Sequence, residues 1–130
     1  MASPDERFRM PDGSVYIVRH PAAETGGAFV EMEFVLPSGC APPPPHVHPH
    51  QVEEYEVLAG RFDLVVEGRW RTLEPGKSAE VAVGALHTFR NRSGETVRVR
   101  NRHRPAMRFE EFIERTCHIL RAAGVTRKRD

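Results

Sequence analysis

The chain has 130 residues, of which 39% are hydrophobic and 28% charged, and its formal net charge is +1. This length suits one domain with a substantial core, and the composition is that of an ordinary soluble globular protein. A net charge so close to zero creates no global basic field. Composition alone therefore does not indicate binding to nucleic acid or to a membrane surface.

The N-terminal segment, residues 1–6, is polar and lacks the apolar region of a secretory signal. No apolar run approaches the roughly 20 residues that a membrane-spanning helix needs. The two cysteines, Cys40 and Cys117, lie far apart without CxxC spacing, and we interpret them as reduced thiols. We therefore expect a cytoplasmic protein.

Short β-rich runs separated by turn residues dominate the first hundred positions. Residues 1–13 are interpreted as an irregular lead-in that ends in the turn signal Pro11-Asp12-Gly13. Runs at intervals of roughly eight to twelve residues are typical of an all-β sandwich or barrel with antiparallel strands. The predicted strands are 15–18, 29–36, 53–59, 61–66, 70–73, 79–83, 86–90 and 96–101.

From Pro105 the apolar residues recur every three or four positions, which predicts one amphipathic helix over about 105–123. Pro105 suits the first turn, and Gly124 suits the position just after the last turn. We expect the apolar stripe to cover the outer face or the open end of the β structure. Residues 126–130 are expected to form a solvated tail, and the whole chain, 1–130, to be a single domain.

The prolines at 42–45 cannot donate hydrogen bonds to a strand ladder, so they form an edge or a loop before His46. A polyproline docking ligand is one interpretation. We favour a short stiff lead into a strand, because no PxxP spacing outside the run supports docking.

Two histidines and a glutamate follow the proline run. His46 and His48 are two residues apart, so on an extended strand both imidazoles leave the same face. Glu53 follows at a short distance, and two imidazoles with one carboxylate can bind a divalent metal. Such a site needs a fourth ligand from elsewhere in the chain.

Two motifs in this order and at this spacing resemble those of the small single-domain cupins. The motif residues are His46, His48, Glu53 and Gly60 in the first, and Gly76, Ala82, Gly84, His87 and Asn91 in the second. The resemblance covers about residues 27–103. It departs at Ala82, where the family usually has proline, and in the six rather than five residues between Gly39 and His46. Both departures fall in turns or loops.

The resemblance implies an antiparallel jelly-roll barrel, at about residues 14–103, that holds a divalent metal through His46, His48, Glu53 and His87. Three imidazoles and one carboxylate leave such an ion positively charged, with one or two open positions. Mixed nitrogen and oxygen ligands suit Fe, Mn, Ni, Cu or Zn, and the sequence does not choose among them.

Several other polar residues receive structural interpretations. We expect His50 at the rim of the site, Asn91 to stabilise a turn, and His103 and His118 to lie at the surface. The arginine-rich run 98–104 is interpreted as a solvated outer strand face, since the aromatic interleaving of a nucleic-acid site is missing.

The favoured hypothesis is a metal-dependent enzyme, an oxygenase-like dioxygenase acting on a small organic molecule, with Glu53 as the catalytic proton acceptor. A non-catalytic module that binds or senses a small ligand is a second hypothesis, and a metal-dependent isomerase or lyase is a third. Apolar residues expected in the interior favour a flat or hydrophobic ligand over a free sugar. These residues are Tyr55, Val57, Phe62, Leu64 and Val66.

We also expect a homodimer, because small β folds of this type leave sheet edges that need cover, and the resemblance points the same way. The predicted strand 15–18 is a candidate for pairing between chains. Neither nucleic acid nor a membrane is an expected partner.

Overall fold

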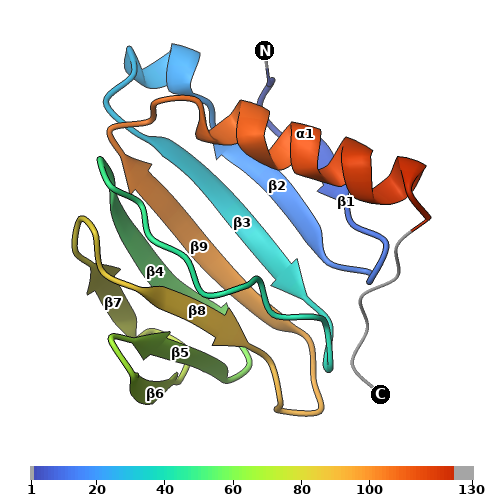
Figure 1. The fold of residues 1–130 in the computed structure, drawn as a ribbon, viewed down its shortest axis with the longest axis vertical. Coiled ribbons are helices and arrows are strands. Elements are labelled where there is room, and N and C mark those ends of the chain that lie inside the picture. The colour runs from blue at the N-terminus through green and yellow to red at the C-terminus, as the bar shows by residue number, and fades with distance from the viewer. Residues whose placement is uncertain (1, 125–130) are drawn as a thin grey trace.

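In the computed structural model, which describes residues 2–124, two antiparallel sheets face each other and a helix lies along one end of the larger sheet (Figure 1). The predicted tail at 126–130 falls outside the described residues. The elements are β1 (Arg7–Arg9), β2 (Val15–His20), the 3₁₀ turn η1 (Ala22–Thr25), β3 (Val30–Leu36), β4 (Val52–Ala59), β5 (Phe62–Val66), β6 (Arg69–Leu73), β7 (Ser78–Val81), β8 (His87–Arg90), β9 (Val97–Arg104) and α1 (Phe109–Ala122).

The larger sheet has the strand order β1-β2-β3-β9-β4-β7, and the smaller has the order β6-β5-β8. Because β9 lies between β3 and β4, strands far apart in sequence become neighbours, as in a jelly roll. The all-β antiparallel jelly-roll prediction is therefore confirmed. The two sheets are not joined into a hydrogen-bonded cylinder: a single bridge, between His46 and His87, extends the smaller sheet toward the proline-rich segment.

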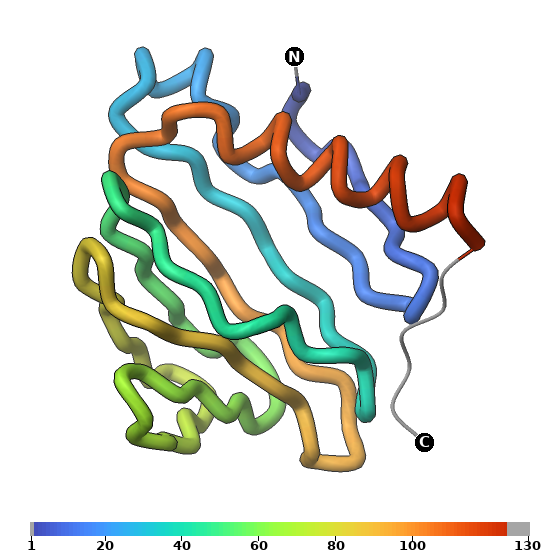
Figure 2. Tube along the Cα trace, in the orientation of Figure 1, coloured from blue at the N-terminus to red at the C-terminus, as the bar shows by residue number. Residues whose placement is uncertain are grey.

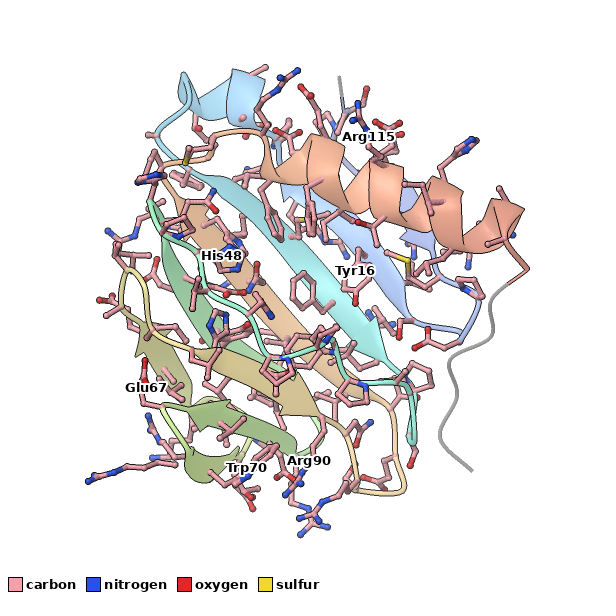
Figure 3. All side chains as sticks on the ribbon, viewed as in Figure 1. Tyr16, His48, Glu67, Trp70, Arg90 and Arg115 are labelled. Atoms are coloured by element: carbon pink, nitrogen blue, oxygen red, sulfur yellow. The ribbon has the colours of Figure 1, made fainter. Side chains whose placement is uncertain are left out.

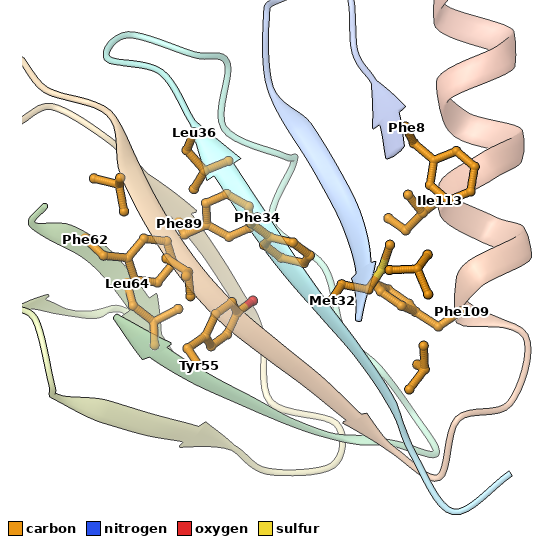
Figure 4. Close-up of a cluster of buried hydrophobic side chains, with 14 of the residues drawn as sticks. Phe8, Met32, Phe34, Leu36, Tyr55, Phe62, Leu64, Phe89, Phe109 and Ile113 are labelled. Carbon is orange, nitrogen blue, oxygen red and sulfur yellow. The ribbon is translucent and has the colours of Figure 1, made fainter. Parts of the chain in front are cut away.

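Alternation along the strands places the core between the sheets. In β3, Met32 and Phe34 face inward, whereas Glu31 and Glu33 face the outer side, where they meet arginines of β9. Figure 4 shows Phe34, Tyr55 and Phe62 within this cluster of buried hydrophobic side chains. The predicted interior residues Tyr55, Val57, Phe62 and Leu64 are buried, and Val66 is half-buried against the same cluster.

The arginine-rich run lies on the outer face of β9, as predicted, and its charges are balanced by glutamates. Arg98 pairs with Glu33, Arg100 with Glu31 and Glu56, Arg102 with Glu31, and Arg104 with Glu54 and Glu80. This face is therefore a lattice of opposite charges and presents no continuous basic surface.

The N-terminal segment differs from the prediction. Arg7–Arg9 forms β1, which pairs with Val15–Ile17 of β2, where an irregular lead-in was expected. Three residues with one inward side chain, Phe8, give too short a pattern to indicate a strand. Because β2 also pairs with β3, it has neighbours on both sides, and the prediction that 15–18 is free to pair between chains is wrong.

The helix begins four residues later than predicted. Met107 has a positive φ of 50°, which is incompatible with a helical turn, so α1 starts at Phe109 after Arg108. Pro105 instead lies in the connection from β9. At the other end Gly124 has a left-handed φ of 67°, in the position predicted for it. No helix within residues 2–124 is long and apolar enough to cross a membrane.

Candidate metal centre

The proline-rich segment runs beside β8, as the trace in Figure 2 shows, and this pairing brings two histidines together. The Thr88 hydroxyl donates to the carbonyl of Pro43 at 2.6 Å. The backbone N–H groups of His46 and His87 each donate to the carbonyl of the other at 3.0 Å. The stiff proline lead thus ends in a bridge, and not in a long strand, and the bridge sets the two imidazoles side by side.

Further backbone contacts fix the tautomers and the next histidine. Nδ1 of His46 donates to the carbonyl of Pro44, and Nδ1 of His87 donates to that of Ala85, both at 2.9 Å. Each ring therefore turns its Nε2 toward the cluster. The N–H of Gly84 donates to the carbonyl of His48 at 3.0 Å. The turn at residues 82–84, where Ala82 replaces the usual proline, therefore still holds the backbone of His48 in place.

The structure brings together all four predicted ligands, His46, His48, Glu53 and His87, with donor atoms within 4.8 Å of one another. Oε1 of Glu53 lies 2.7 Å from Nε2 of His87 and 3.4 Å from Nε2 of His48. Donors that share one ion at roughly 2.1 Å are separated by about 3–4 Å, a range that the Glu53–His48 distance matches and that the full 4.8 Å spread exceeds slightly. The ligand prediction therefore agrees with the geometry.

Charge balance gives an independent test of whether a cation fits. Glu53 is 3% exposed, and in the described part of the chain its ion-pair partners are all histidines. Burial acts to raise the pKa of Glu53, but hydrogen bonds from His48 and His87 outweigh burial and hold that pKa well below its ordinary value. A buried carboxylate that stays ionised among imidazoles is suited to a bound divalent cation.

The histidines respond to the same environment. Burial acts to lower the pKa of His87, but its hydrogen bond to Glu53 outweighs burial and raises it. Burial lowers the pKa of His46. Because an imidazole must be deprotonated at its ligating nitrogen, binding of a cation in this cluster competes with protons.

The cluster opens into a pocket of about 550 Å³ between the sheets and α1. Figure 3 shows Tyr16 and His48 in the space beside the helix. His46, His48 and Glu53 contribute polar atoms to this pocket, and His50 lies exposed at its rim, as predicted. Most of the remaining wall is apolar or aromatic, and includes Phe34, Pro43, Pro44, Tyr55, Phe89, Phe109, Phe112 and Ile113.

The surface prediction for His103 is wrong. This residue is 0% exposed and lies on β9 directly opposite Glu53 of β4. Its Nε2 is 3.4 Å from Nε2 of His48 and 3.5 Å from Oε2 of Glu53. The alternation that placed the arginines of 98–104 outside also places Asn101 and His103 inside, so the signal was present in the sequence.

The two remaining polar predictions are confirmed. Asn91 stabilises its turn, since Nδ2 donates to the carbonyls of Leu36 and Glu95 and Oδ1 accepts from the N–H of Ser93. His118 is exposed on α1.

Comparison with known sequences identifies the family. The sequence model of the cupin domain matches residues 32–101, which is more than half of the chain. The chain belongs to the cupin family. The match extends across both ligand segments of this cupin and through most of β9.

Individual relatives place this cupin near domains of different roles. It is 36% identical over 52 residues to the HTH-type transcriptional regulator SutR of Escherichia coli K12, a match that spans 38% of this chain and only 29% of the regulator. A crystal structure of a predicted oxalate decarboxylase from Thermotoga maritima superposes with a TM-score of 0.69 at 16% identity, over 78% of this chain and 92% of that one.

A second similar structure is again a domain of a transcriptional regulator. The cupin domain of an XRE family transcriptional regulator from Enterobacter cloacae superposes with a TM-score of 0.61 at 26% identity, and covers 70% of this chain and 95% of that domain. The Thermotoga likeness shows the fold alone.

Proposed function

We propose that this cupin is a metal-dependent enzyme that oxygenates a small, largely apolar organic molecule with dioxygen as the oxidant. One observation carries the proposal: His46, His48 and Glu53 of the four-residue cluster line a 550 Å³ pocket whose other walls are mostly apolar. A bound divalent ion would supply Lewis-acid or redox chemistry with coordination positions left open toward the pocket.

The chain's own residues would bind and orient the organic molecule. Aromatic walls such as Phe34, Phe89 and Phe109 favour a flat apolar body, and burial against them excludes water from the cluster. The polar atoms of the cluster would then meet a polar group of the molecule. A free sugar, with hydroxyls on every side, would leave many of them without partners against this wall.

Glu53 is the carboxylate that lines the pocket, and we propose that it accepts a proton from the bound molecule. Because Glu53 would also hold the ion, the carboxylate would have to loosen from it before accepting this proton. General-base catalysis of this kind contributes about 10²–10⁴-fold in rate.

The test begins with elemental analysis of protein purified without added metal, followed by O2-uptake assays with the Fe, Mn, Ni and Cu forms. Flavonoids, catechols, thiols and keto acids form the substrate panel. For an active substrate, Glu53→Gln keeps the size of the side chain and one oxygen ligand, so turnover should fall far more than metal content. If no member of the panel consumes O2 with any metal, the oxygenase proposal is overturned.

The likeness to the cupin domains of two transcriptional regulators favours a second candidate, a module that binds a small ligand without changing it. The same panel separates the two candidates. A sensing module would give ligand-dependent increases in melting temperature and unaltered ligand recovered after incubation, whereas an enzyme would give product.

A further inference from the structure

The two oxygens of the Glu53 carboxylate have different surroundings. Oε1 faces the ligand histidines, 2.7 Å from Nε2 of His87 and 3.4 Å from Nε2 of His48. Oε2 faces the neighbouring strand β9, where Nδ2 of Asn101 donates to it at 2.6 Å and Nε2 of His103 lies 3.5 Å away. One side of the carboxylate therefore belongs to the ligand cluster and the other to β9.

Strand pairing produces this division. Glu53 is directly opposite His103, and Tyr55 is opposite Asn101, so both β9 side chains project inward beside the carboxylate. Asn101 and His103 are each 0% exposed, and Glu53 is 3% exposed, so the contacts to Oε2 are made in the protein interior. Their positions are set by the backbone ladder and not by flexible loops, and this gives them the rigidity that a ligand-orienting group needs.

The ring of His103 is also held from behind. It stacks on Phe109 of α1 with ring centroids 3.6 Å apart and an interplanar angle of 20°. Its Nδ1 has no hydrogen-bond partner among the described residues. A buried imidazole nitrogen without a partner costs stability, so packing alone gives no reason for a histidine here.

We propose that His103 is a positioning residue of the metal centre: together with Asn101 it holds Oε2 of Glu53, so that the carboxylate presents Oε1 alone to the ion. This rests on the proposed function only in requiring that the cluster bind a metal. Binding through one oxygen leaves free a coordination position that a two-oxygen mode would occupy. His103 lies outside the group of donors that are all within 4.8 Å of one another, which favours orientation of Glu53 over a fifth ligand.

Two substitutions remove the contacts to Oε2 separately. His103→Leu fills the buried site without an N–H donor, whereas His103→Gln keeps an N–H that can reach the same oxygen. Asn101→Leu removes the hydrogen bond that Nδ2 donates to this oxygen. His118→Leu, an identical change at an exposed histidine of α1, is the matched control. The probe is Co(II) alone, titrated into metal-free protein, with affinity and the visible ligand-field spectrum as readouts.

Loss of a group that orients a ligand typically weakens metal binding by about 10- to 100-fold. We expect a weakening of this size, and a changed Co(II) spectrum, for His103→Leu and for Asn101→Leu. His103→Gln should recover most of the affinity and the parent spectrum, and His118→Leu should match the parent. Thermal melting of the metal-free variants shows whether each still folds, and if His103→Leu does not, Asn101→Leu and His103→Gln carry the test.

Three outcomes overturn the inference. If both leucine variants keep the Co(II) affinity and spectrum of the parent, the contacts of Asn101 and His103 with Oε2 do not orient Glu53. Equal losses in His103→Gln and His103→Leu, with a spectrum of one nitrogen donor fewer, would make His103 a ligand instead. Failure of the parent protein to bind Co(II) would remove both this inference and the proposed function. Metal binding with the expected variant pattern but without turnover would overturn the proposed function alone.

Discussion

At the scale of single residues, the ligand histidines and the neighbouring His50 differ in a way that metal analysis can measure. His48 supplies a donor atom inside the cluster, whereas His50 is exposed at the pocket rim. We predict that His48→Ala lowers bound transition metal from near one equivalent to a small fraction, because three donors hold the ion much less tightly than four. His50→Ala should keep the parent content. Elemental analysis checks both, and unchanged metal in His48→Ala would remove His48 from the ligand set.

The replacement of His103 should affect stability much less than it affects metal binding. Its buried Nδ1 lacks a partner among the described residues, and such groups cost about 1–3 kcal/mol. We predict that His103→Leu leaves the metal-free protein within about 1–3 kcal/mol of the parent in urea unfolding, because relief of this cost offsets the lost contact with Oε2 of Glu53. A larger loss in the metal-free form would contradict this.

The ligands and the residues behind them differ in how far the sequence predicts them. His46, His48, Glu53 and His87 belong to two motifs of fixed spacing, so their convergence follows once the strands pair. His103 has no motif, and its inward direction depends on the strand parity of β9. That parity was used for the arginines, but a histidine between two arginines looks like part of a polar surface. The structure resolves the position of His103 because it shows that β9 pairs with β4, which sets His103 opposite Glu53.

At the scale of elements, Gly60 in the turn between β4 and β5 shows why the first motif ends in glycine. Its φ is +79°, and a Cβ there would lie 2.9 Å from both the carbonyl oxygen of Thr96 and Cγ2 of Val97. Gly68, in the turn between β5 and β6, has a φ of +80° but no heavy atom within 4 Å of the same position. An alanine at position 68 would therefore meet backbone strain alone, whereas an alanine at position 60 would meet the same strain together with a steric collision.

We predict that Gly68→Ala costs about 1–2 kcal/mol, the usual penalty for a left-handed non-glycine residue. Gly60→Ala should cost about 1–3 kcal/mol more, because the backbone of the β9 segment must move to admit the methyl group. Urea unfolding of the two variants side by side measures the difference. Equal losses would show that the contact with Thr96 and Val97 yields without cost.

The elements that sequence analysis placed least well lack a repeated pattern. β1 has three residues, so a single inward Phe8 carries its whole apolar signal. The change of period at Pro105 predicts a helix from that residue, but the positive φ of Met107 delays the start of α1 to Phe109. Longer elements such as β3, β4 and β9 repeat their alternation several times, and the sequence predicts all three as strands.

At the scale of the whole molecule, the charge lattice on the outer face of the larger sheet links stability to acid. Burial acts to raise the pKa values of Glu31 and Glu33, but hydrogen bonds from Arg102 and Arg100 to the first, and from Arg19 and Arg98 to the second, outweigh burial and lower them. A carboxylate with a lowered folded-state pKa stabilises the protein fully above its unfolded-state pKa, whose ordinary value is 4.5. That contribution is lost as the pH falls through the folded-state value.

We therefore predict that the melting temperature of the metal-free protein falls as the pH drops below about 4.5, and that Glu31→Gln with Glu33→Gln makes this fall shallower while lowering stability at neutral pH. Melting curves by circular dichroism between pH 3 and pH 7 check both effects. Parallel curves for the parent and the double variant would show that the lattice contributes nothing measurable, as is common for exposed ion pairs.

The oligomeric state is the remaining property of the whole molecule, and we propose a homodimer that covers the exposed side of α1. Phe112 and Ile119 are 60% and 58% exposed and lie two turns apart on one side of the helix. Burial of these two side chains against a second copy would remove apolar surface from water. β1 is a poor alternative, because Cys117 and Arg121 of α1 donate to the carbonyl of Arg9 at its edge.

We expect the parent protein to have the mass of two chains in light scattering at micromolar concentration, and the Ile119→Glu variant to have the mass of one chain. Val83→Glu, at an apolar residue exposed elsewhere, should remain dimeric. A parent protein with the mass of one chain would end the proposal, and an Ile119→Glu variant that stays dimeric would move the interface away from the helix.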